Sequence, residues 1–157
     1  MKRSLTTAFA FAALVAAGSL PSPALAGTGG IDPDGTPSGG SGGDVEGLSP
    51  SYEKFVNLVS GDTDLSLRVL GAWTLAEGGP RDNPLNIGPG KRFGSVAGGA
   101  RATSDLLSQS SYRKILASAR RSDRDQISAI ARSSWCPGCS GYERLLKRTY
   151  RQVSVKP

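Results

Sequence analysis

The stretch LRVLGAWTLAEGGPRDNPLNIG, residues 67–88, joins an apolar helix to a segment that has no helical period. Val69 and Trp73 fall on one face of the helix, which predicts that this face packs into the core. The Gly-Gly-Pro sequence at 78–80 ends the helix, because glycine interrupts it and proline cannot continue it. Glu77 therefore stands in the last turn of an apolar helix or directly after it.

Apolar side chains recur at helical spacing on both sides of this stretch and predict a compact, mainly α domain. Between residues 78 and 94 we expect one long irregular loop, with room for a short β-hairpin, and such loops are often functional. Gly98 and Gly99 would permit a close backbone approach inside the next helix. The expected helix boundaries are an N-cap at Ser49 with Pro50, an end at Gly61, a start at Asp62 or Thr63, a cap at Ser95, a start at Ser110 or Ser111, an Asp123–Gln126 capping box, and a start near Tyr142.

The N-terminal part of the chain predicts export and a flexible connection. Residues 1–26 have the features of a secretory signal peptide: two basic residues, a short apolar run and an A-x-A cleavage site ending at Ala26. An uncleaved membrane anchor is the alternative, but the apolar run falls short of the ~20 residues that a span needs. Residues 27–47 are mostly Gly, Ser, Pro, Thr and Asp, which predicts an acidic linker. The folded domain should therefore cover residues 48–157.

This domain is strongly basic. Residues 48–157 contain 17 of the chain's 19 Lys and Arg residues and 9 of its 13 Asp and Glu residues, a formal net charge of +8. Such a charge serves solubility, but it also attracts polyanions, which outside a cell are cell-wall polymers, anionic membranes and stray nucleic acid. Since no aromatic-studded strand suggests base stacking, we do not expect nucleic acid as the partner.

The two cysteines stand in SSWCPGCSGY, residues 133–142, with the Cys-x-x-Cys spacing of redox proteins. A thioredoxin-like site needs a preceding strand, whereas the residues before Trp135 are expected to be helical and only 18 residues follow Cys139. In a secreted chain Cys136 and Cys139 are most simply a disulfide. A secreted thiol-disulfide protein remains an alternative. A zinc site would need more ligands than two cysteines in a chain without histidine.

The absence of histidine removes Ser-His-Asp and Cys-His hydrolytic sites, so carboxylates remain for hydrolysis. Glu77 stands alone in the apolar sequence LGAWTLAEGG. Burial beside Trp73 and Leu75 would disfavour its charged form, as a general acid requires. A surface glutamate is the other interpretation, although a helix C-terminus favours cations.

Short motifs follow Glu77 in a recurring order. They are a Gly/Pro loop, NPLNI at residues 83–87, Phe93, Ser-Val at 95–96, Gly99, a helix ending near Tyr112, and later Ser134-Trp135 and Tyr142. In this order and spacing, residues 69–150 resemble the lysozyme-like superfamily. The closest layout is that of bacterial and phage peptidoglycan hydrolases of the transglycosylase and glucosaminidase kind. The chain departs from them at Gly78, where transglycosylases usually carry Ser, and in the Cys-Pro-Gly-Cys segment.

The resemblance implies a secreted, cell-wall-associated glycoside hydrolase or lytic transglycosylase that cleaves β-1,4 bonds between GlcNAc and MurNAc, with muramidase or glucosaminidase specificity open. Glu77 would be the general acid, and Asp82, followed by Asp105, is the nearest candidate for a second carboxylate. The residues expected to contact sugar are Trp73, Asn83, Asn86, Phe93, Trp135 and Tyr142. Peptidoglycan and anionic wall polymers are the expected partners, with no metal or organic cofactor, no integral membrane anchor and a monomeric state. A non-catalytic wall-binding module is the alternative from another class.

Overall fold

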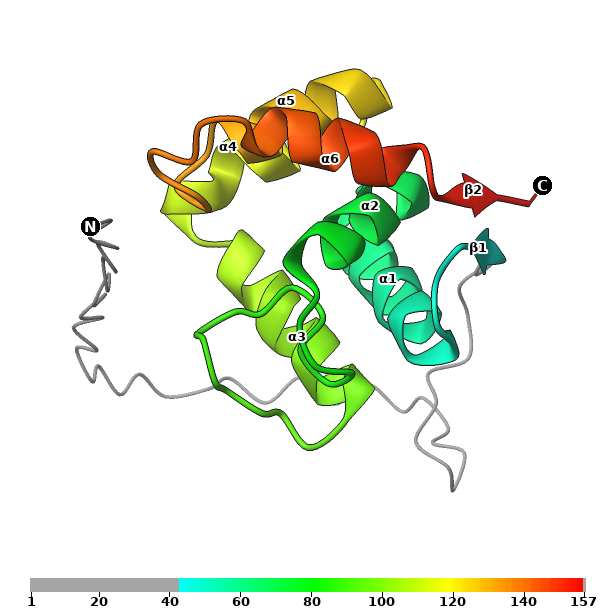
Figure 1. Cartoon of the computed structure of the whole chain (residues 1–157). Helices are drawn as coiled ribbons and strands as arrows, with labels where there is room; N and C mark the ends of the chain where they lie inside the picture. The colour runs from blue at the N-terminus through cyan, green and yellow to red at the C-terminus, as the bar shows by residue number, and fades with distance from the viewer. Residues whose placement is uncertain (1–42, 157) are drawn as a thin grey trace, which may run out of the picture. The chain divides into compact units, whose positions relative to one another are not determined.

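A computed structural model describes residues 43–156 of the protein, so the predicted signal peptide and the predicted linker up to residue 42 lie outside the described residues. The elements in chain order are β1 (Val45–Glu46), α1 (Pro50–Thr63), α2 (Leu67–Glu77), α3 (Val96–Leu107), the 3-10 turn η1 (Ser110–Tyr112), α4 (Arg113–Leu116), α5 (Asp123–Ala131), α6 (Tyr142–Tyr150) and β2 (Ser154–Val155) (Figure 1). The predicted mainly α fold class is confirmed. Within the described range, no helix is long and apolar enough to cross a membrane.

A short antiparallel strand pair joins the two ends of the described chain. β1 pairs with β2 in the register Val45–Val155 and Glu46–Ser154, and the Lys156 ammonium lies 2.9 Å from the Glu46 carboxylate. Val45 is only 3% exposed. The linker that was predicted to extend to residue 47 therefore ends earlier, because its last residues belong to the folded domain.

α2 is the central helix of the domain. It packs against α1 and α6 and also contacts α5, while α1 packs on α3 (Figure 1). All residues from 69 to 74 are buried, including Leu70 and Trp73 at 0% exposure. A helix that is covered on all sides needs apolar residues around its whole circumference, which the sequence of α2 supplies.

Several predicted helix starts are confirmed. The side chains of Ser49 and Ser95 cap α1 and α3 by accepting a hydrogen bond from an amide of the first turn. α6 starts at Tyr142 as predicted. The predicted fourth helix begins at Ser110, but its first turn is the 3-10 turn η1 and the α-helical part follows.

The boundary between α1 and α2 differs from the prediction. α1 continues past Gly61, where its end was expected, and stops at Thr63. Asp64 then adopts the left-handed conformation with φ 59°, which a short polar side chain tolerates. α2 consequently starts at Leu67.

The predicted capping box of α5 is wrong. The Ser122 side chain caps the helix by itself, and the Gln126 side chain is buried at 2% exposure. Its oxygen accepts a hydrogen bond from the Ser66 amide, and its nitrogen donates to the carbonyls of Ala119 and Arg121. Because a buried amide needs its own partners, Gln126 ties α5 to the start of α2 instead of capping its own helix.

The loop between α2 and α3 contains no strand, so the β-hairpin for which the sequence left room does not form. Asn83 organises the loop instead: its side-chain nitrogen donates to the carbonyls of Ile87 and Lys91, and its oxygen accepts from the Ile87 amide. Leu85 is 0% exposed and anchors the loop in the core.

The backbone of this loop touches α3 at Gly99. A Cβ atom at Gly99 would lie 1.9 Å from the carbonyl oxygen of Asp82. The close backbone approach predicted for the glycine pair is therefore present, and it fixes the loop on the helix.

Two glycine-to-alanine substitutions test this contact. Gly99→Ala should lower the free energy of unfolding by about 1–3 kcal/mol, because the loop must move away from the new methyl group. Gly61→Ala is the matched control. It lies in α1, and apart from the adjoining residues and backbone of that helix no atom of the described residues lies within 4 Å of the new Cβ, so it should raise the same free energy by about 0.5–1 kcal/mol. Denaturant unfolding measures both, and equal effects would contradict the contact.

Candidate active site

Glu77 is the last residue of α2. Gly78 follows in the left-handed conformation with φ 59°, and its amide donates to the Thr74 carbonyl at 2.9 Å. The helix therefore ends where the Gly-Gly-Pro sequence predicted. It presents the Glu77 side chain, which is partly exposed, at the start of the loop.

One oxygen of the Glu77 carboxylate is held by two aromatic side chains from the C-terminal part of the chain. The Trp135 indole N–H donates to Glu77 Oε1 at 3.0 Å, and the Tyr142 hydroxyl donates to the same atom. Among residues 43–156, Glu77 Oε2 has no hydrogen-bond partner and is not buried. The carboxylate is thus fixed through one oxygen and presents the other at the surface.

Trp73 supports this arrangement from the core. Its side chain is 0% exposed, and its indole N–H donates to the Tyr142 hydroxyl oxygen at 3.0 Å. The ring of Trp135 meets it edge to face, with the centroids 4.5 Å apart. Trp73 was expected to contact sugar, but because it is completely buried its role is to position Tyr142 and Trp135.

The Tyr142 hydroxyl is a permanent donor to Glu77. Burial raises the pKa of Tyr142, and the hydrogen bond to Glu77 and the charge of that carboxylate raise it further. These effects outweigh the opposite influence of the Trp73 and Trp135 N–H groups. The hydroxyl therefore remains protonated over the physiological range of pH.

The cysteine pair lies between the two donors. Cys136 and Cys139 are at disulfide distance, with their Cα atoms 5.4 Å apart, as predicted from the sequence. Trp135 directly precedes the pair, and the Tyr142 amide donates to the Cys139 carbonyl at 3.2 Å. The cross-link therefore fixes the spacing of Trp135 and Tyr142. A thioredoxin-like site would require a strand directly before the cysteines. Within residues 43–156 the element before them is the helix α5, and neither β1 nor β2 adjoins them.

Asp82 holds the loop and is not presented to a ligand. Its carboxylate accepts hydrogen bonds from Arg92 Nε at 2.7 Å and from the amides of Phe93 and Gly94 at 2.8 and 3.0 Å. Burial raises the pKa of Asp82, but these hydrogen bonds outweigh it and hold the pKa below its usual value. Both oxygens are occupied, so the role of second carboxylate does not fit Asp82. Asp105, the other candidate, is exposed on α3.

The two asparagines of the loop differ in what they offer a ligand. Asn83 is 0% exposed, and its side-chain atoms are hydrogen-bonded within the loop. It was expected to contact sugar, but in this position it is not accessible to a ligand. Asn86 is partly exposed in the left-handed conformation with φ 52°. Its side chain makes no hydrogen bond among residues 43–156 and is available to a ligand.

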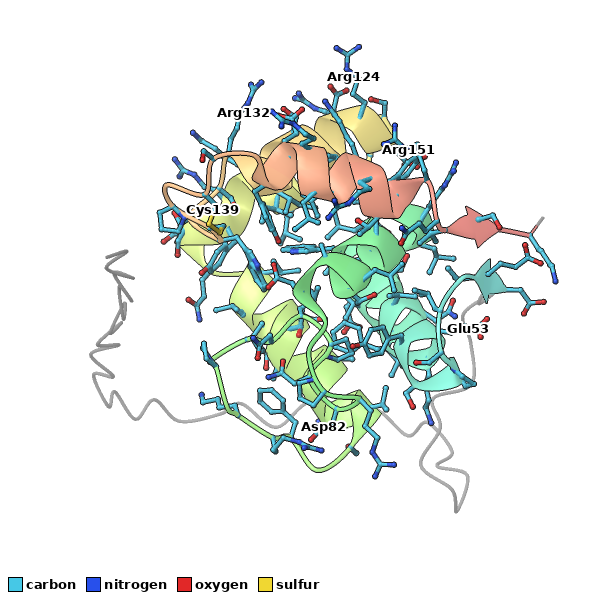
Figure 2. The ribbon with its side chains drawn as sticks, viewed as in Figure 1. Glu53, Asp82, Arg124, Arg132, Cys139 and Arg151 are labelled. Carbon is cyan, nitrogen blue, oxygen red and sulfur yellow. A yellow bond between two sulfur atoms is a disulfide. The ribbon has the colours of Figure 1, made fainter. Side chains whose placement is uncertain are left out.

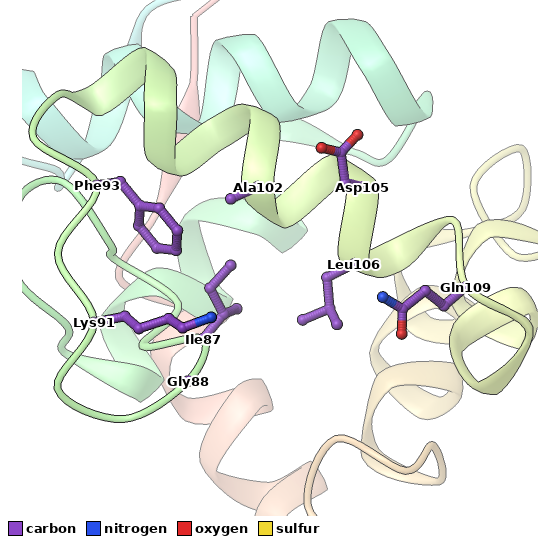
Figure 3. A pocket seen from close by; sticks show the side chains of 8 residues that line it. All are labelled: Ile87, Gly88, Lys91, Phe93, Ala102, Asp105, Leu106 and Gln109. Carbon is purple, nitrogen blue, oxygen red and sulfur yellow. The ribbon is translucent and has the colours of Figure 1, made fainter. Parts of the chain in front are cut away.

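A hollow of about 310 Å³ lies between this loop and α3 (Figure 3). Ile87, Lys91 and Phe93 line it from the loop, and Asp105 and Gln109 line it from the region of α3. Figure 3 shows the Phe93 ring and the Lys91 side chain reaching in from the loop. Phe93 therefore lines a hollow that is open to a ligand, and its predicted contact with sugar stays a prediction.

A run of contacts connects the hollow to Glu77, which does not line it. The Tyr112 amide donates to the Gln109 carbonyl at 2.9 Å, and the Tyr112 ring meets Trp135 with the centroids 5.9 Å apart. Trp135 in turn holds Glu77. Sequence reasoning missed this role of Tyr112, for which its position as a lone aromatic residue in the polar sequence SQSSYRK was the available signal.

Comparisons of the chain with protein-family models, with curated proteins and with solved structures find no match. Among the residues that the structure describes, no group of three or more His, Cys, Asp or Glu side chains lies close enough together to hold a metal ion.

Removing the Tyr142 hydroxyl tests the buried network. Tyr142→Phe should lower the free energy of unfolding by about 1–3 kcal/mol, because the buried N–H of Trp73 loses its acceptor. Tyr112→Phe is the control, since the Tyr112 hydroxyl makes no hydrogen bond among residues 43–156. It should change the free energy by less than about 0.5 kcal/mol. Denaturant unfolding measures both, and similar losses would rule out a special role for the Tyr142 hydroxyl.

Proposed function

We propose that the protein cleaves the glycan strands of peptidoglycan at β-1,4 bonds between GlcNAc and MurNAc, with Glu77 as the general acid. The resemblance of residues 69–150 to lysozyme-like peptidoglycan hydrolases suggests the chemistry. The predicted signal peptide and the basic domain are in keeping with an extracellular enzyme held at an anionic cell wall. The observation that carries the proposal is the one-sided hydrogen bonding of the Glu77 carboxylate.

This bonding determines where an acid proton resides. A protonated carboxyl group has one O–H donor, and its other oxygen is an acceptor only. Because Glu77 Oε1 accepts from Trp135 and Tyr142, the proton belongs on Oε2, which has no partner among residues 43–156. A proton on that oxygen is available to a ligand at the surface, as general acid catalysis requires.

In the proposed reaction, Glu77 Oε2 gives its proton to the glycosidic oxygen while the bond from that oxygen to the anomeric carbon breaks. The bonding electron pair stays with the leaving oxygen, and the other sugar becomes oxocarbenium-like. Trp135 and Tyr142 then stabilise the resulting Glu77 carboxylate by donating to Oε1. The same carboxylate takes up a proton from the sugar hydroxyl group or the water molecule that adds to the anomeric carbon.

We propose that Glu77 acts without a second carboxylate, since both oxygens of Asp82 are engaged in the loop. Two routes then complete the reaction. The C6 hydroxyl of the muramyl sugar attacks its own anomeric carbon, as in lytic transglycosylases, or the substrate's N-acetyl group assists and water completes a hydrolysis.

A non-catalytic wall-binding module is the second candidate. The hollow beside α3 favours it, because Phe93, Lys91 and Gln109 line this hollow and Glu77 does not. These side chains would bind sugar or peptide in the hollow without cleaving a bond. Such a module would bind purified cell walls and release no soluble fragments from them.

Glu77→Gln should lower the release of soluble fragments from purified cell walls by about 10²-fold or more, because general acid catalysis contributes about 10²–10⁴-fold to a rate. The amide oxygen of Gln still accepts from Trp135 and Tyr142, so the fold should survive. Unfolding measurements check that point.

Glu143→Gln is the matched control for this variant. Glu143 lies beside Tyr142 but pairs with Lys147 at 2.6 Å, so its replacement should leave the rate within about twofold. Full lytic activity in Glu77→Gln would remove Glu77 from the mechanism. Equal losses in both variants would indicate a general electrostatic effect.

A further inference from the structure

A second hollow, of about 440 Å³, lies over α4, α5 and the turn between them, and none of its lining residues belongs to the candidate active site. Its size is within the range of about 300–1,000 Å³ that small-molecule sites occupy. The lining residues are Lys114, Ala117, Ser118, Arg121, Asp125, Ser128, Ala129 and Arg132. Figure 2 shows Arg132 projecting outward from this part of the domain.

The cations of this hollow lack ion-pair partners. Lys114, Arg121 and Arg132 are all exposed, and none of them takes part in a salt bridge among residues 43–156. The one lining carboxylate, Asp125, accepts a hydrogen bond from the Ser122 hydroxyl at 2.9 Å. The lining therefore carries three positive charges against one negative charge.

Acidic residues nearby do not neutralise the hollow. The pKa of Glu143 is lowered mainly by its hydrogen bond to Lys147, 2.6 Å away, and to a smaller extent by the charge of Arg132. Lys147 is therefore the main partner of this carboxylate. The Asp123 carboxylate does not line the hollow, and it accepts a hydrogen bond from the Tyr150 hydroxyl at 2.6 Å. Between residues 113 and 132 the chain has six Lys and Arg residues against two Asp residues.

We propose that this hollow binds the phosphate groups of a polymer whose repeating units are small and non-aromatic. Guanidinium forks bind phosphate oxygens through two parallel hydrogen bonds, and a lysine ammonium adds a compact charge. Arg121, Arg132 and Lys114 supply these groups around one hollow. The Ser128 hydroxyl, which also lines it, has no hydrogen-bond partner among residues 43–156 and adds a neutral donor.

The lining favours a phosphate polymer without bases over nucleic acid. Proteins that bind single-stranded nucleic acid place aromatic side chains on the bases, and none of the residues that line this hollow is aromatic. Phosphate is favoured over carboxylate because the oxygens of a phosphodiester point in tetrahedral directions, whereas both oxygens of a carboxylate lie in one plane. The donors of the hollow come from α4 (Lys114), from the turn that follows it (Arg121) and from the end of α5 (Arg132).

The proposal is independent of glycan cleavage, since the hollow shares no residue with Glu77 and its donors. Glu77→Gln should bind the phosphate polymer as the unchanged protein does. Conversely, replacing the cationic residues that line the hollow should leave the rate of cleavage of soluble glycan fragments unchanged if the proposed function holds.

Calorimetric titration of the purified protein with poly(glycerol phosphate) at low ionic strength tests the proposal. The combined variant Lys114→Gln, Arg121→Gln and Arg132→Gln should bind about tenfold more weakly or worse, because it loses all the charge-assisted hydrogen bonds of the hollow. Unfolding measurements verify that this variant folds, as substitutions at exposed positions should allow.

A second variant removes the same charge elsewhere. Arg101, Arg148 and Arg151 are exposed and line neither this hollow nor the one beside α3. Their combined replacement by Gln should weaken binding by less than about threefold, since distant exposed charges are screened. Equal losses in the two variants would overturn the proposal, because diffuse charge alone would then account for binding.

Two further ligands test the chemistry. Polyglutamate, a polymer of carboxylates, should bind about tenfold more weakly than poly(glycerol phosphate), and so should a single-stranded oligonucleotide of matched charge. Polyglutamate binding as tight as that of the phosphate polymer would overturn the choice of phosphate. An oligonucleotide that binds more tightly, and loses affinity in the variant of the hollow, would overturn the choice of a polymer without bases.

Discussion

A single oxygen atom, Oε1 of Glu77, accepts the Trp135 indole N–H and the Tyr142 hydroxyl, and so joins the end of α2 to the segment that leads into α6. Trp73, buried on α2, holds the same tyrosine from beneath. The network lies at one end of the contact between α2 and α6, and it includes Trp73, the largest fully buried side chain of the domain. Packing of the core and placement of the carboxylate therefore depend on the same side chains.

Features that follow from neighbouring residues could be predicted from the sequence. The end of α2 at Glu77, the Ser49 and Ser95 caps and the start of α6 are set by local backbone and side-chain preferences. The cysteine pair, three residues apart, could also be predicted because a turn dipeptide separates its members.

Features that depend on how the loop and the core fold could not be predicted. Asp82 was the candidate for a second catalytic carboxylate and Asn83 was expected to contact sugar, but the loop uses both side chains to satisfy its own amides and carbonyls. Gln126 was assigned to a local cap, and it bonds the Ser66 amide 60 residues away instead. In each case a buried polar group meets its hydrogen-bond partner only when the chain is folded. The spacing of residues in the sequence does not reveal that partner.

Mass spectrometry of the fragments released from purified peptidoglycan tests whether the surface-facing oxygen of Glu77 protonates a glycosidic bond. We expect fragments with new sugar ends at β-1,4 bonds between GlcNAc and MurNAc, with intact peptide stems. A 1,6-anhydro end would identify attack by the C6 hydroxyl, and a reducing end would identify water as the nucleophile. Release of fragments cut only in the peptides, or no new sugar ends at all, would contradict this role of Glu77.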